Sequence, residues 1–84
     1  MDKDINRSVI NLRDSYFSLD NEVQEKLNMF IENLQHGNFT SSKIQNLFKQ
    51  NTGIDLVQDS IKYAMLLNNY IPKDMHTQDW EFSI

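Results

Sequence analysis

The chain has 84 residues, of which 12 are acidic and 8 basic, and its net charge is −4. This length allows one domain, and the scattered basic residues do not attract nucleic acid or an anionic membrane, so we expect neither as a partner. The absence of cysteine excludes disulfides and fits a cytoplasmic protein. No apolar run approaches the ~20 residues of a membrane helix.

The first two predicted helices are marked by apolar residues at helical spacing. The first runs from about residue 4 to 17, with Asp4 as a candidate N-cap. Its stripe consists of Ile5, Val9, Leu12 and Tyr16. The second runs from about residue 19 to 35, with Asp20 and Glu22 in its first turn. Its stripe consists of Val23, Leu27, Phe30, Ile31 and Leu34. Gly37 is expected to be the left-handed residue that ends it.

The next two predicted helices flank Gly53. The third runs from about residue 41 to 51, with Thr40 as a cap and a narrow apolar stripe. The fourth runs from about residue 56 to 70, where Asp55 and Gln58 resemble a capping box and Pro72 follows the end. Apolar residues cover more than half of its circumference, so we expect it to be central or shared between two subunits.

The final segment, residues 73–84, has a different pattern. It opens with polar residues and then alternates, which is the period-two spacing of a strand. Trp80, Phe82 and Ile84 share one side of this alternation. They either fold back to cover the chain's own core or dock on a partner.

These patterns predict an all-α protein, a small bundle of three to four helices with a C-terminal aromatic tail, which forms a dimer. The helical domain is expected to span residues 1–72, and the tail, residues 73–84, to pack on the core or on a partner. The expected dimer or partner interface comprises Tyr16, Phe17, Tyr63, Leu67, Trp80, Phe82 and Ile84.

We find no residue pattern that indicates catalysis, a cofactor or a metal. His36 and His76 lie far apart and lack ligand-like neighbours at helical spacing. Serines occur outside any nucleophile-elbow context, and no glycine-rich loop could hold phosphate. We therefore expect no enzyme.

In an alternative interpretation, the third and fourth predicted helices form a helix-turn-helix. The helix that reads the DNA would then present Gln58, Asp59, Lys62 and Asn68. The acidic residues near its beginning would repel phosphates, so an ordinary helical hairpin is the stronger interpretation.

The residue spacing from Tyr16 to about Leu67 also resembles a known family. The matching residues are Tyr16, Phe17, Glu25, Leu27, Leu34, Gly37, Ser41, Lys43, Ile44 and Leu47. The chain is similar in this respect to the YmgB/AriR family of small enterobacterial two-component-system connector proteins. The resemblance implies an α-helical homodimer that regulates biofilm formation and acid resistance through a response regulator, and DNA binding is also proposed for that family.

The sequence thus leads to a first hypothesis and two alternatives. The first is a small non-enzymatic regulatory adaptor that, as a dimer, binds and modulates a signalling or transcription regulator. An alternative is a phage- or plasmid-borne inhibitor or immunity protein, because acidic proteins suit basic nucleic-acid enzymes as targets. The other alternative is a helix-turn-helix-like DNA-binding regulator.

Overall fold

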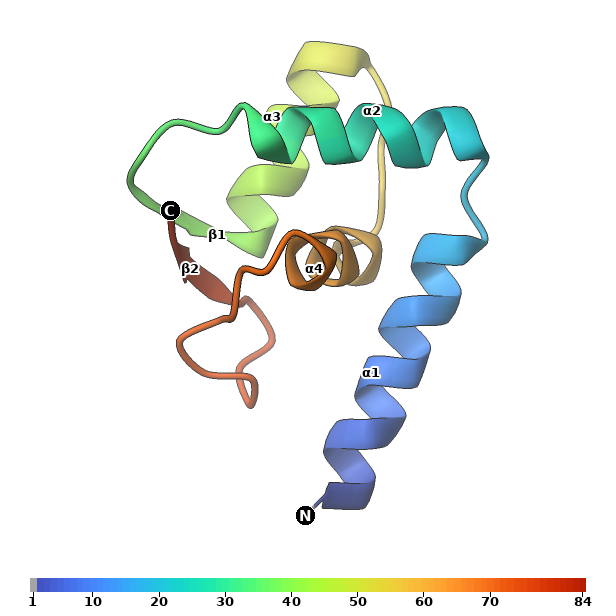
Figure 1. Ribbon diagram of the computed structural model, residues 1–84, viewed down its shortest axis with the longest axis vertical. Helices are drawn as coiled ribbons and strands as arrows, with labels where there is room; N and C mark the ends of the chain where they lie inside the picture. The colour runs from blue at the N-terminus through green and yellow to red at the C-terminus, as the bar shows by residue number, and fades with distance from the viewer. Residues whose placement is uncertain (1) are drawn as a thin grey trace.

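The computed structural model describes residues 2–84, and the side chains from residue 9 onward. Helix α1 already begins at Asp2, so Asp4 lies inside the helix and the predicted Asp4 N-cap is wrong. The contribution of Ile5 to the first stripe lies outside the described side chains. The elements are α1 (Asp2–Phe17), α2 (Asn21–Glu32), β1 (Asn38–Thr40), α3 (Ser41–Thr52), α4 (Gln58–Leu67) and β2 (Glu81–Ser83) (Figure 1). The protein is mostly helical, as predicted, and has in addition a two-stranded sheet.

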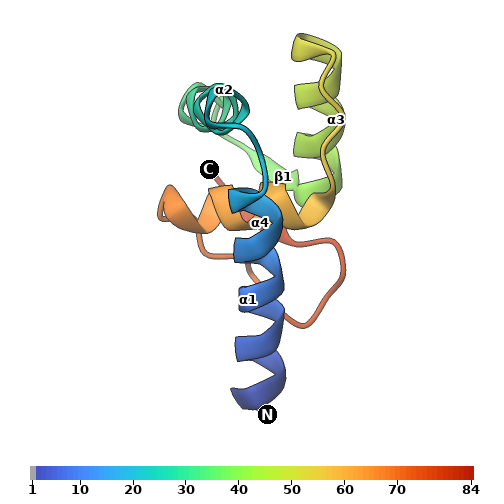
Figure 2. The same cartoon turned by 90° about the vertical axis from the view of Figure 1, so that its right-hand side faces the viewer.

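Helix α4 lies at the centre of the structure, in keeping with its wide apolar surface. Helices α1, α2 and α3 all pack against it. The first half of α1 extends away from the other elements (Figures 1 and 2). The core consists of residues from every helix and from the tail: Leu12, Tyr16, Leu27, Ile31, Ile44, Phe48, Leu56, Ile61, Ala64, Met65, Trp80 and Phe82.

Helix α3 begins and ends as its sequence predicts. The Thr40 hydroxyl accepts a hydrogen bond from the backbone N–H of Lys43, which otherwise would lack a partner. Gly53 follows the helix with φ +76°, and its N–H donates to the carbonyl of Lys49 at 2.8 Å. Both termini are therefore fixed by local chemistry.

The predicted end of α2 is wrong. The helix stops at Glu32, and Gly37 lies beyond it, where it exchanges backbone hydrogen bonds with Ile84 at 2.8 and 3.0 Å. Gly37 thus extends the sheet and does not cap the helix.

The predicted bounds of α4 also need correction. Its N-cap residue is Val57, and the capping box does not form. Asp55 forms an ion pair with Lys49 at 3.5 Å, and Gln58 accepts from the Ser41 hydroxyl at 2.9 Å. The helix ends at Leu67, and the left-handed φ of +68° at Asn69 stops its continuation before Pro72 is reached.

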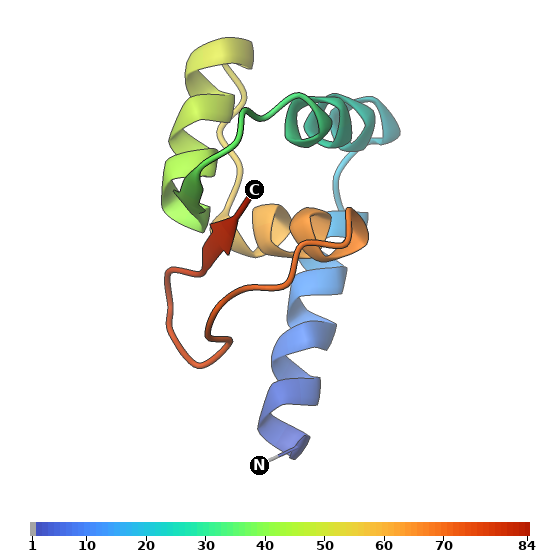
Figure 3. The ribbon, with the colours of Figure 1, turned by 60° about the vertical axis from the view of Figure 1, so that its left-hand side comes forward.

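The tail returns along the protein and forms the second strand. β2 pairs with β1 in antiparallel register, with Phe39 opposite Phe82 (Figure 3). Trp80 is 3% exposed and Phe82 is fully buried. The predicted alternation therefore corresponds to a real strand, whose inward side chains are part of this chain's own core. Its three-residue partner, β1, has no strand pattern in the sequence and was not predicted.

Candidate interaction surface

Three aromatic side chains meet where α1 crosses α4. The ring centroids of Tyr16 and Phe17 are 5.1 Å apart. The centroid of the Tyr63 ring lies 5.5 Å from that of Tyr16 and 5.7 Å from that of Phe17. Tyr16 is 3% exposed, and its hydroxyl accepts from the Asn28 amide at 2.7 Å. Tyr16 therefore holds α1 and α2 in place.

The outer part of this cluster forms an exposed apolar surface. Phe17 is 58% exposed, and Leu67, one turn after the half-buried Tyr63, is 48% exposed. Ile10 lies two turns before Phe17 on α1 and is 46% exposed. We call Ile10, Phe17, Tyr63 and Leu67 the α1/α4 patch.

The other expected interface residues lie elsewhere. Trp80 and Phe82 are buried against the core of their own chain, with ring centroids 6.2 Å apart. Ile84 is half-buried, and its backbone is bonded to Gly37. Of the seven expected residues, Phe17, Tyr63 and Leu67 reach the surface together in the α1/α4 patch.

A cation lies against the buried indole of Trp80. The Lys62 ammonium is 5.1 Å from the centre of the Trp80 ring, and the Lys62 residue is only 9% exposed. A cation over an indole face is stabilised by the negative face of the ring. In the sequence, Lys62 stands out only as a candidate DNA contact, and its place on the Trp80 ring depends on a tertiary contact that no local pattern predicts.

The loop before β2 is tied to the beginning of α3 by a polar cluster. Asp79 accepts from the Ser42 N–H at 2.9 Å and from the Ser42 hydroxyl at 2.6 Å. The buried Ser41 hydroxyl lies 2.9 Å from Asp79 and accepts from the Trp80 N–H at 3.0 Å. Asp79 thus caps a helix from 37 residues away in sequence.

The same contacts change the acidity of Asp79. Desolvation alone would raise the pKa of its carboxyl group. The hydrogen bonds from Ser42 and Ser41, together with the positive charge of Lys62, outweigh this effect and lower the pKa below its ordinary value.

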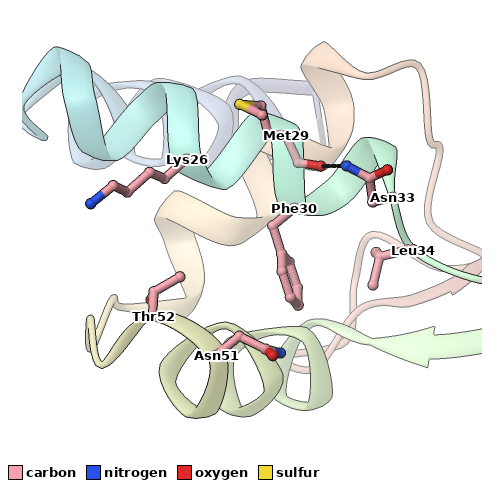
Figure 4. A pocket seen from close by; sticks show the side chains of 7 residues that line it. All are labelled: Lys26, Met29, Phe30, Asn33, Leu34, Asn51 and Thr52. Atoms are coloured by element: carbon pink, nitrogen blue, oxygen red, sulfur yellow. Dashed lines mark hydrogen bonds between the residues drawn. The ribbon is translucent and has the colours of Figure 1, made fainter.

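A groove of about 580 Å³ separates α2 from α3. Its lining residues are Lys26, Met29, Phe30, Asn33, Leu34, Asn51 and Thr52 (Figure 4). Phe30 points from α2 toward α3 and meets Phe48 edge-on, with ring centroids 5.5 Å apart. The Met29 side chain points away from α3 (Figure 4), but the lining residues Asn33, Asn51 and Thr52 are exposed, so the groove is open to solvent.

The groups that could support other chemistry are dispersed. His36 and His76 are both exposed, and the described residues contain no group of three side chains that could hold a metal ion. Within the same residues, no helix is long and apolar enough to cross a membrane. Comparisons with models of protein families, with characterised proteins and with solved structures found no match for this chain.

Proposed function

We propose that this protein is a small non-enzymatic regulatory adaptor that forms a dimer and binds a protein regulator of signalling or transcription. Its mechanism is stoichiometric binding without turnover. The likeness of residues 16–67 to the connector family makes a response regulator the first candidate partner. The absence of cysteine suits the reducing cytoplasm, where we place it.

The α1/α4 patch is the observation that carries this proposal. Two of its large side chains, Phe17 and Leu67, are about half exposed, and the Phe17 ring lies 5.7 Å from that of the half-buried Tyr63, one turn before Leu67. Full burial of an exposed side chain of this size is worth roughly 1.5–3 kcal/mol, so burying the exposed half of each is worth about 1 kcal/mol. Adjacent exposed apolar side chains of this kind are typical of a protein–protein contact.

The shape of α1 supports a second copy as the occupant of this patch. A stable dimer buries about 800 Å² on each partner, which is more than Phe17 and Leu67 can supply. Because the first half of α1 extends away from the other elements (Figure 2), this helix offers further surface beyond Phe17 and Leu67. A two-fold interface along α1 would use the same patch on both copies.

Affinity capture from the native host tests the regulatory role. Wild-type protein as bait should retain one regulatory protein in stoichiometric amount, identified by mass spectrometry. The control bait is Asn46→Ser, a change at an exposed residue of α3 remote from the patch. Recovery of nucleic acid without any protein by both baits would contradict the proposal.

DNA binding is the second candidate, and one structural feature favours it. The pair α3–α4 is followed by a loop that returns as β2, and the Lys73 N–H before the loop donates to the Glu81 carbonyl at 2.9 Å. Two helices followed by such a loop and strand are the arrangement of winged helix-turn-helix domains.

The side chains of α4 favour the adaptor instead. Gln58 is bonded to Ser41, Lys62 lies against Trp80, and Asn68 donates to Asn28 at 2.9 Å. In addition, α1 packs on α4, and Ser60 donates to the Ser15 carbonyl at 3.2 Å. Three of the four groups that would read bases, namely Gln58, Lys62 and Asn68, are thus engaged within the protein.

A gel-shift experiment at physiological salt distinguishes the two functions. We expect only weak binding of duplex DNA without sequence preference, because the net charge is −4. A specific footprint that is lost in Lys62→Met, while the variant stays folded by circular dichroism, would favour the DNA-binding function.

A further inference from the structure

We propose that two copies of this chain pair through antiparallel α1 helices, in a register that places Arg13 of each copy against Asp14 of the other. This inference rests on the proposed function, because it deepens the proposal of a dimer at the α1/α4 patch. It names two further residues, and these determine the orientation and the register of the contact.

The exposed side of α1 carries apolar and charged side chains in a fixed order. Ile10 and Phe17 are seven residues, or two turns, apart, so they lie almost on one line along the helix. Arg13 and Asp14 lie between them and flank this line on its two sides. All four residues are exposed. This line is therefore separate from the side of α1 that is buried against α4.

The charges of Arg13 and Asp14 are available to a second copy. Within one chain, the Arg13 Nε and the Asp14 Oδ1 are 3.8 Å apart, and both side chains are more than half exposed. An exposed ion pair of this kind contributes little to stability. Both groups can therefore turn toward a partner without a large loss of free energy.

One antiparallel register pairs the whole line with itself. In two helices related by a two-fold axis, the numbers of facing residues have a constant sum. A sum of 27 places Ile10 opposite Phe17 of the second copy, beside Tyr63 of α4. The same sum places Arg13 opposite Asp14 of the second copy. Apolar groups thus meet apolar groups, and each charge meets its opposite.

Other arrangements leave these groups unmatched. If Ile10 faced Ile10, Phe17 would be level with residue 3, which is a lysine. If Phe17 faced Phe17, Ile10 would lie beyond the end of the opposite α1. Parallel helices would place Arg13 against Arg13 and Asp14 against Asp14. Because like charges across a contact are unfavourable, the charge pattern selects the antiparallel register.

The shape of the chain agrees with this arrangement. Helix α1 has 16 residues and is about 24 Å long. Its first half extends away from the other elements (Figures 1 and 2). A two-fold axis beside residues 13 and 14 places the remaining elements of each copy beside the free half of the other copy's α1. The contact therefore extends beyond the α1/α4 patch, toward the about 800 Å² per partner that stable dimers bury.

Charge reversal tests the pairing. Arg13→Asp and Asp14→Arg each place like charges opposite each other in both halves of the contact. Each variant alone should therefore dimerise at least about tenfold more weakly than wild type in sedimentation equilibrium. An equimolar mixture of the two variants restores opposite charges and should form heterodimers, which native mass spectrometry recognises by their mass. Circular dichroism checks that each variant is folded.

Matched controls change the same charges elsewhere. Lys49→Asp and Asp55→Arg reverse the exposed ion pair formed by α3 and the segment that follows it. They alter the net charge of the chain by the same amounts as the two α1 variants. Both controls should dimerise as wild type does. Equal weakening by the controls and the α1 variants would overturn the inference.

A spin label reports the orientation of the helices. The chain contains no cysteine, so Asp4→Cys provides a single labelling site in the first half of α1. The proposed register places the two copies of residue 4 about 30 Å apart, whereas parallel helices would place them about 10 Å apart. Pulsed electron paramagnetic resonance distinguishes the two distances, and the shorter one would overturn the inference.

The remaining outcomes separate this inference from the proposed function. If wild-type protein dimerises but neither charge reversal weakens the dimer, the inference fails and the dimer of the proposed function stands. Failure of the folded variants to form heterodimers has the same meaning. If wild-type protein is monomeric at micromolar concentration, both the register and the dimer are excluded. Affinity capture then tests the regulatory role by itself.

Discussion

The carboxylate of Asp79 accepts a hydrogen bond from the backbone N–H of Ser42 at 2.9 Å and so caps α3 from the far end of the chain. Asp79→Ala removes this bond and both serine hydroxyl contacts. We expect unfolding in urea to show a loss of about 1 kcal/mol, as for other helix caps. Asp55→Ala removes an exposed ion pair, so it should cost less than the Asp79 substitution. If Asp79→Ala and Asp55→Ala lost equal free energy of unfolding, the cap would contribute no more to stability than the exposed ion pair does.

The lowered pKa of Asp79 predicts a pH dependence of stability. A carboxyl group whose pKa is lower in the folded state stabilises the protein above its unfolded pKa of 3.8. This contribution is lost as the pH falls through the folded pKa, because the proton then neutralises the group in both states. The stability difference between wild type and Asp79→Asn should therefore be largest near neutral pH and shrink below about pH 4. A difference that is constant or grows on acidification contradicts this.

The tail contributes to stability through its buried side chains. Phe82→Ala should destabilise the protein by about 3–5 kcal/mol, a large part of the ~5–10 kcal/mol expected for a domain of this size. Removing residues 79–84 should abolish cooperative thermal unfolding followed by circular dichroism. The control Ile71→Ala changes a residue that is 72% exposed and should have little effect. Intact stability after the deletion would show that the tail does not belong to the core.

Gly53 is required for its backbone conformation. A Cβ at this position meets no atom within 4 Å, but φ is +76°. Gly53→Ala should therefore cost about 1 kcal/mol through backbone strain alone. Gly53→Asn should cost less, because asparagine tolerates the left-handed region. Chemical denaturation of the two variants measures this order, and the reverse order would exclude strain as the cause.

Sequence patterns correctly predicted those features of the fold that depend on residue type and on neighbouring residues. The Thr40 cap, the Gly53 terminus and the central position of α4 all follow from residue type and helical spacing. The end of α2 and the beginning of α4 could not be predicted in this way. Gly37 and Gln58, which we expected to cap these helices, form tertiary contacts with Ile84 and Ser41 instead. Such contacts join residues that are distant in sequence.

The candidate surfaces were predictable to different degrees. Apolar spacing singled out Phe17 and Leu67, but it could not separate them from the buried Tyr16 and Phe82, since exposure depends on how α1 crosses α4. The groove between α2 and α3 was missed, because it depends on the separation of two helices over α4.

Sedimentation equilibrium of wild type and Phe17→Ser shows directly whether the α1/α4 patch binds a second copy. Wild-type protein should be a dimer at micromolar concentration and dissociate on dilution, whereas Phe17→Ser should be a folded monomer. The matched variant Met29→Ser, exposed to a similar degree on α2, should remain dimeric. A wild-type protein that is monomeric throughout this range, with stability unchanged by dilution, would exclude a dimer formed through this patch.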